Sequence, residues 1–152
     1  MAAFKLAEGK DNNMSKETVT ALIEAALAAR NMSYAPYSRY QVGAALLTEA
    51  GTIYQGGNIE NASYGATNCA ERTAFFKAIS EGETEFRAIA IAGGLRGRTP
   101  ADYAYPCGIC RQVMKEFVKD DFQIIVAKST TEYKAYTMAE ILPFGFGGES
   151  IQ

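Results

Sequence analysis

All three cysteines of this chain fall into one pattern, and the chain contains no histidine. Cys69 stands at the start of one predicted helix, and Cys107 and Cys110 stand three residues apart at the start of another. Such a CxxC pair alone would also fit a redox pair, and cysteines are often simply buried. With an upstream thiol, the set is typical of zinc, which has four ligands in structural sites and three with an open position in catalytic sites. The sequence therefore favours a fold that brings two helix starts together around one zinc ion with an open position.

Composition limits what the chain can bind and where it works. Of its 152 residues, 48% are hydrophobic and 21% charged, as in a soluble globular domain. The net charge is −2 and the basic residues are scattered, which disfavours a nucleic-acid partner. We expect no signal peptide, because residues 1–13 have no apolar core followed by a small-residue cleavage site. We also expect no membrane span, because no apolar run approaches about 20 residues. An odd number of thiols without a secretory signal favours a reducing compartment, so we expect a cytoplasmic protein.

Alternating helical and buried-strand patterns predict an α/β fold. We expect a flexible N-terminal extension over 1–13 and a single catalytic domain over 14–152. The helices are predicted at 15–31, 69–80, 107–119 and 138–142. The strands are predicted at 42–48, 52–55, 86–92, 122–127 and 132–136. This order predicts a three-layer α-β-α sandwich around a mixed sheet of about five strands. The segment 93–106 is predicted as a long loop, and long loops are often functional.

Two charged residues follow Cys69 closely. Glu71 is too near Cys69 in sequence to join it comfortably as a ligand, but a carboxylate there can take up and return protons beside the metal. Its alternative is a solvated glutamate that complements the helix dipole. Arg72 could be a surface arginine, or it could donate to the thiolates and withdraw electron density from them.

A polar segment at 57–64 precedes Cys69. In an extended chain Asn58 and Glu60 point the same way, so they can hold adjacent hydroxyls of a sugar; alternatively, the segment is a turn that satisfies its own backbone. Tyr40 and Phe146 are aromatic residues at loop edges. Each fits either the core or a platform for stacking.

Several motifs agree in order and spacing with one known family. The segments 58–64 (NIENASY), 69–74 (CAERTA), 106–112 (PCGICRQ) and 141–143 (ILP) resemble cytidine deaminase of the short, homotetrameric, three-cysteine type. The similarity extends from about residue 15 to 146. A zinc-bound Pro-Cys-x-x-Cys arrangement with a glutamate acid/base is the general signature of zinc deaminases.

The resemblance implies a role for each matched residue. It implies one zinc ion per subunit, bound by Cys69, Cys107 and Cys110, with Glu71 as the proton carrier. It implies a substrate pocket formed by Tyr40, Asn58, Glu60, Ala62, Tyr64, Ala70 and Phe146. Relatives often have phenylalanine where Tyr40 stands. The resemblance also implies a homotetramer in which Phe146 reaches into the pocket of a neighbouring subunit.

We therefore predict hydrolytic deamination of cytidine and 2′-deoxycytidine in pyrimidine salvage. The expected partner is a small nucleoside, without nucleic acid or membrane. One alternative is a deaminase of blasticidin-type nucleosides, free cytosine or cytosine in a polynucleotide; the sugar-binding pair disfavours the free base, and a pI near 5.3 disfavours the polynucleotide. The other alternative is a zinc-stabilised binding module without chemistry.

Overall fold

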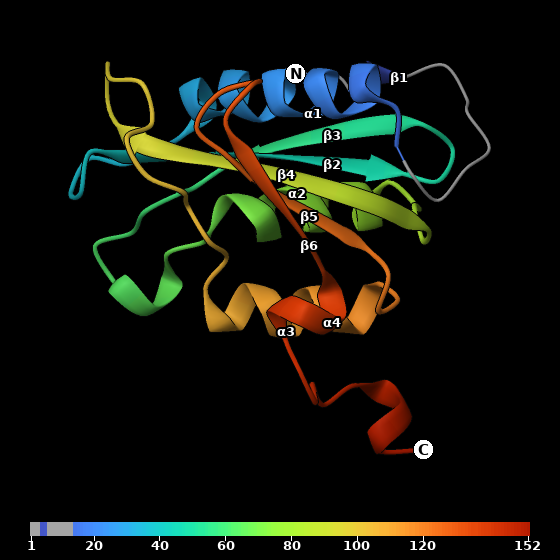
Figure 1. Cartoon of the computed structure of the whole chain (residues 1–152). Helices are drawn as coiled ribbons and strands as arrows, with labels where there is room; N and C mark the ends of the chain where they lie inside the picture. The colour runs from blue at the N-terminus through green and yellow to red at the C-terminus, as the bar shows by residue number, and fades with distance from the viewer. Residues whose placement is uncertain (1–3, 6–13) are drawn as a thin grey trace.

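The computed structural model describes residues 4–5 and 14–152, and its centre is a mixed sheet (Figure 1). The strands are β1 (Phe4–Lys5), β2 (Tyr40–Thr48), β3 (Thr52–Gly57), β4 (Phe86–Leu95), β5 (Gln123–Ala127) and β6 (Tyr133–Thr137). Their order in the sheet is β1-β3-β2-β4-β5-β6. Strands β4 and β5 are parallel, and the other neighbouring pairs are antiparallel. The mixed sheet of about five strands is confirmed, with the two-residue β1 as an addition at one edge.

Helices cover both faces of the sheet and give the predicted three layers (Figure 1). The helices are α1 (Lys16–Ala29), α2 (Ala70–Ser80), α3 (Gly108–Phe117) and α4 (Met138–Ile141). Short 3-10 turns are η1 (Arg30–Met32), η2 (Tyr64–Ala66) and η3 (Gly148–Ser150). Helix α1 packs on one face, and α2, α3 and α4 pack on the other.

The central strands are buried on both faces, which explains their continuous apolar runs. Along β2, Ala44 and Leu46 belong to the core beneath α2 and α3. Their neighbours Ala45 and Leu47 belong to the core beneath α1. Successive side chains of a strand point to opposite faces, so one apolar strand serves two cores.

Local capping signals set two helix starts where the sequence predicts them. The Ser15 hydroxyl accepts a hydrogen bond from the Thr18 N–H at the start of α1. At α4, the Thr137 hydroxyl accepts from the Glu140 N–H, and the Glu140 carboxylate accepts from the Thr137 N–H at 2.7 Å. These side chains satisfy N–H groups that a helix leaves unpaired at its first turn.

Most of the expected flexible extension, 1–3 and 6–13, lies outside the described residues. The part inside them, Phe4–Lys5, pairs with Thr52 and Ile53 of β3. Among the described residues, no helix is long and apolar enough to cross a membrane.

Candidate active site

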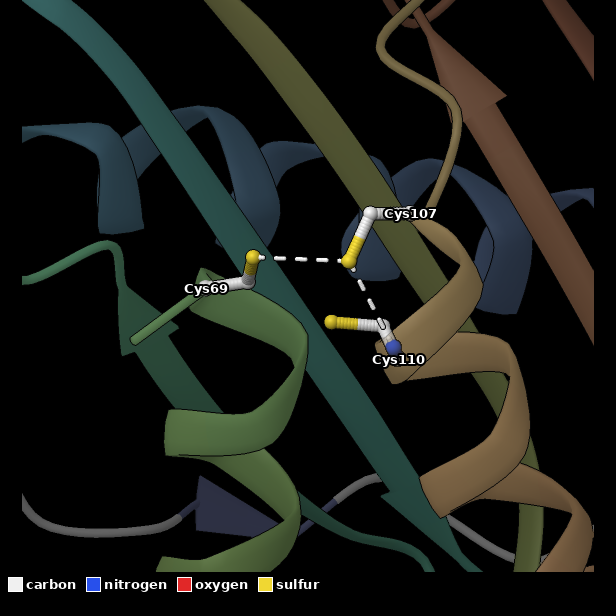
Figure 2. A group of neighbouring side chains, drawn as sticks. All are labelled: Cys69, Cys107 and Cys110. Carbon is white, nitrogen blue, oxygen red and sulfur yellow. Dashed lines mark hydrogen bonds between the residues drawn. The ribbon is translucent and has the colours of Figure 1, made fainter. Parts of the chain in front are cut away.

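Two helix N-termini meet at the three cysteines (Figure 2). Cys69 is the N-cap of α2, Cys107 is the N-cap of α3, and Cys110 lies in the first turn of α3. The three sulfur atoms all lie within 4.8 Å of one another, and those of Cys69 and Cys107 are 3.8 Å apart. The backbone N–H of Cys110 also donates to the Cys107 sulfur at 3.5 Å. The partial positive charge of both helix starts favours thiolates at this point.

The spacing of the sulfur atoms fits a zinc ion. Tetrahedral coordination with Zn–S bonds of about 2.3 Å places neighbouring sulfurs about 3.8 Å apart. The Cys69–Cys107 distance agrees with this value, and all three cysteines are free rather than disulfide-bonded. Among the described residues, these three cysteines form the whole group, and no histidine or acidic residue joins them as a fourth member. The residues present therefore fit a zinc ion with three protein ligands.

The thiols of Cys69 and Cys110 differ in pKa. The pKa of Cys69 falls to about 5, because the Cys110 thiol and the Arg72 guanidinium both donate hydrogen bonds to its thiolate. Arg72 Nη2 lies 3.3 Å from the Cys69 sulfur. The hydrogen bond to Cys69, together with burial, raises the pKa of Cys110. Of Cys69 and Cys110, Cys69 therefore loses its proton more easily, and its sulfur is the one that accepts a hydrogen bond from Arg72.

Glu71 is a buried carboxyl group beside the sulfur cluster. It lies in the first turn of α2 and is 4% exposed. The Cys110 sulfur lies 3.8 Å from its Oε2. Burial, and after it the negative charge of Cys69, raises the pKa of Glu71 to about 7. A carboxyl group with such a pKa can exchange a proton near neutral pH, as a general acid/base must.

A cavity of about 330 Å³ opens onto Glu71 and two of the cysteines. Its volume is at the lower end of the range for small-molecule sites, roughly 300–1,000 Å³. The predicted site residues that line it are Tyr40, Asn58, Glu60, Cys69, Ala70, Glu71 and Cys107. The structure therefore brings the predicted sugar-binding pair, the predicted base platform and two of the three predicted metal ligands to one hollow.

The predicted sugar-binding pair also holds the backbone around the cavity. The Asn58 amide accepts from the Val42 N–H and donates to the Tyr40 carbonyl, both at 2.9 Å. The Glu60 carboxylate accepts from the N–H groups of Tyr37 and Ser38 and from the Ser38 hydroxyl. That hydroxyl hydrogen bond is the main reason why the pKa of Glu60 is lowered. Glu60 is therefore a carboxylate at neutral pH and offers acceptor oxygens to a ligand.

Comparison with known proteins identifies the family. Residues 16–126 match the model of the cytidine and deoxycytidylate deaminase zinc-binding region. A cytidine deaminase of Halalkalibacterium halodurans is 47% identical over 86% of this chain and 95% of its own length.

The chain belongs to the cytidine deaminase family.

Solved structures of the family agree with this fold. The crystal structure of the cytidine deaminase from Burkholderia pseudomallei is 46% identical with a TM-score of 0.75, covering 83% of this chain and 97% of its own. The cytidine deaminase from Mycobacterium tuberculosis is 35% identical with a TM-score of 0.71, covering 84% and 95%. The three-layer α/β fold is thus shared, and the chain is a hydrolase of this family.

Three of the predicted pocket residues, Ala62, Tyr64 and Phe146, do not line the cavity of the single chain. Ala62 and Tyr64 are exposed, and Tyr64 lines an adjoining hollow of about 450 Å³ that shares Glu60 with the cavity. Phe146 lies in the C-terminal segment, which extends away from the layers after α4 (Figure 1), and is 59% exposed. Its carbonyl accepts a hydrogen bond from the Gln112 side chain.

The cavity also has walls that sequence reasoning missed. Ala104 and Tyr105 line it from the long loop before α3, and Val42, Thr67 and Asn68 complete it. The Tyr105 hydroxyl lies 3.1 Å from that of Tyr136 on β6, which ties the loop to the sheet edge. The available signal was position, because both residues immediately precede the Pro106-Cys107 start of α3.

Proposed function

We propose that this protein catalyses the zinc-dependent hydrolysis of cytidine and 2′-deoxycytidine to uridine and 2′-deoxyuridine, with release of ammonia, in pyrimidine salvage. The observation that carries the proposal is a buried carboxyl group, Glu71, placed against a three-sulfur cluster at the end of a nucleoside-sized cavity. The names of the relatives support the same activity.

Cys69, Cys107 and Cys110 would hold one zinc ion per chain. When bound, zinc supplies a Lewis acid that makes water a nucleophile near neutral pH. Glu71 has the position and the raised pKa needed to accept a proton from the attacking water and deliver it to N3 of the base. As the water oxygen bonds to C4, a hydroxyl group forms there. The same carboxyl group then takes the proton of that hydroxyl and gives it to the amino group, so that the C4 carbonyl forms, the C4–N bond breaks and ammonia leaves. Because Glu71 is buried, bulk water does not compete for its proton.

The remainder of the cavity would hold the nucleoside. Glu60 offers carboxylate oxygens, and Asn58 has a second amide hydrogen besides the one that it donates to Tyr40, so together they suit the hydroxyls on the 3′ side of a ribose. Tyr40 presents an aromatic ring for the base, and the small Ala70 leaves space beside Glu71. A free base would leave the sugar-binding groups unused.

A substrate panel tests this function. We expect the purified protein to deaminate cytidine and 2′-deoxycytidine, followed by the change in ultraviolet absorbance, and to be nearly inactive on cytosine and a cytosine-containing oligonucleotide. Blasticidin S belongs in the same panel, because its preferential turnover would favour the nucleoside-antibiotic alternative. Full zinc occupancy without turnover of any of these compounds would favour a binding module instead.

Arg72 is proposed to hold the Cys69 sulfur and withdraw electron density from it. Replacing Arg72 by Gln removes a charged donor 3.3 Å from that sulfur. We expect zinc affinity or kcat to fall by about 10- to 100-fold, the usual cost of losing a residue that supports a metal ligand. Metal analysis after competition with a chelator measures the first, and steady-state kinetics measures the second.

The matched control for this change is Arg98→Gln, which replaces an exposed arginine outside the cavity. If Arg72→Gln retains zinc and turns over substrate as well as Arg98→Gln does, the supporting role is wrong.

We also propose that the protein acts as a homotetramer with shared active sites. Large apolar side chains are exposed near the cysteines, at Tyr64 and Ile109, and in the C-terminal segment, at Phe144 and Phe146. Exposed apolar clusters of this kind mark interaction surfaces, and a second copy whose Phe146 enters the cavity region would cover them. Sedimentation velocity tests the assembly, because a chain of 16.4 kDa and its tetramer are well separated in mass.

The cytoplasm remains the compartment that we propose. All three cysteines are free and are placed for metal binding rather than for disulfides. A reducing compartment keeps such thiols available for zinc.

A further inference from the structure

Two glycines, Gly93 and Gly94, are adjacent near the end of β4. A methyl group added at Gly93 would lie 2.8 Å from Cβ of Ala104 and 2.9 Å from Cε1 of Tyr40. Both of these residues line the cavity. Neither glycine has a backbone conformation that excludes other residues. Gly93 is therefore required here because it has no side chain, and not because of its backbone conformation.

Gly94 points to the opposite side of the strand. A methyl group there would lie 3.0 Å from Nη2 of Arg30 and 3.1 Å from Cα of Pro100, and neither of these residues lines the cavity. Successive strand residues face opposite sides of a sheet, so the two glycines differ in environment although they are neighbours. Gly94 is thus a built-in comparison for Gly93.

Strand pairing fixes Tyr40 beside Gly93. In the β2–β4 ladder, Tyr40 pairs with Leu95 and Val42 pairs with Gly93. From its place in β2 the Tyr40 ring lies over Gly93, and its hydroxyl is 3.1 Å from where a Cβ of residue 93 would be. A side chain at this position would displace the Tyr40 ring and Ala104, and both of these residues form walls of the cavity.

We propose that Gly93 is a positioning residue for the nucleoside: its lack of a side chain seats the Tyr40 ring against β4 and so sets the width of the cavity where the base binds. The proposal rests on the proposed deaminase function. Because the cavity measures only about 330 Å³, a displaced aromatic ring would remove space that the substrate needs. Gly93 would act on substrate binding and not on Glu71 or the metal, which lie on other elements.

The comparison of Gly93→Ala with Gly94→Ala tests this. Overpacking a filled site typically costs enough to weaken binding by about tenfold, so we expect Gly93→Ala to raise the KM for cytidine by about that factor. We expect its kcat to change by less than about threefold and its zinc content to stay at the wild-type level, because the acid/base and the ligands are untouched. Gly94→Ala should leave KM within about twofold of wild type. Melting temperatures of both variants report any general loss of stability.

A compensating change keeps the test decisive if Gly93→Ala folds poorly. The double variant Gly93→Ala/Ala104→Gly removes the shortest of the three contacts, so its KM should fall between those of wild type and the single variant. A wild-type KM in Gly93→Ala, or an equal rise in Gly94→Ala, would overturn the inference while the deaminase function stands. An inactive wild-type protein would overturn the proposed function itself.

Discussion

The Glu71→Gln protein is expected to bind zinc and to lose deaminase activity by a factor of about 10⁴, the upper end of what one general acid/base contributes. Glutamine has the shape of glutamate, so the buried position should remain filled. Its amide cannot accept a proton from water or return one to the base and the leaving amino group. Loss of cytidine absorbance measures the rate, and metal analysis shows whether zinc is retained.

The matched control is Glu81→Gln, which makes the same chemical change at an exposed glutamate at the other end of α2. It should keep wild-type activity. Turnover by Glu71→Gln within about tenfold of this control would show that another group moves the proton, and the assignment of Glu71 would be wrong.

The second large effect concerns the metal. Cys110→Ser replaces a fully buried sulfur of the three-cysteine cluster and should abolish both stable zinc binding and deamination. A ligand that binds only the folded state at 100 times its Kd adds about 2.7 kcal/mol of stability, so loss of zinc should also lower the melting temperature. Calorimetry with and without a chelator measures this contribution.

The wild-type protein supplies the comparison, since the chain has no cysteine outside the cluster. Chelation should lower the melting temperature of wild type and leave that of Cys110→Ser unchanged. Added zinc should then restore activity to wild type alone. A wild-type protein that stays fully active after its metal is removed would contradict the whole metal-centred interpretation.

The helices and strands were predictable because their signals are local. Ser15 and Thr137 cap helices by contacts within four residues, and the apolar runs of the strands record burial on two faces. The end of β4 was predicted at Ala92 and lies at Leu95, since Gly93 and Gly94 extend the pairing with β2. Glycines indicate a loop by propensity, and here tertiary pairing outweighs that preference.

The grouping of Glu71 and Arg72 with the cysteines was also predictable, because these residues share short motifs. Glu71 and Arg72 follow Cys69 within one helical turn, so the sequence distance nearly fixes their spatial distance. The cavity walls were harder to predict. Ala104 and Tyr105 reach the cavity through a long loop, and the contact between Gly93 and the Tyr40 ring joins residues more than fifty positions apart. Such contacts depend on the complete fold and have no local pattern.

The proposed reacting groups lie on α2 and the outer cavity walls lie on other segments, which has a consequence for engineering. One helix start carries Cys69, the proposed sulfur ligand, Glu71, the proposed proton carrier, and the arginine that contacts the Cys69 sulfur. The outer walls come from β2, the segment around Asn58 and the loop before α3. To obtain activity on bulkier nucleoside drugs, the wall residues should therefore be randomised and the first turn of α2 left unchanged. Substrate selectivity would then change while the groups proposed to carry out the reaction stay the same.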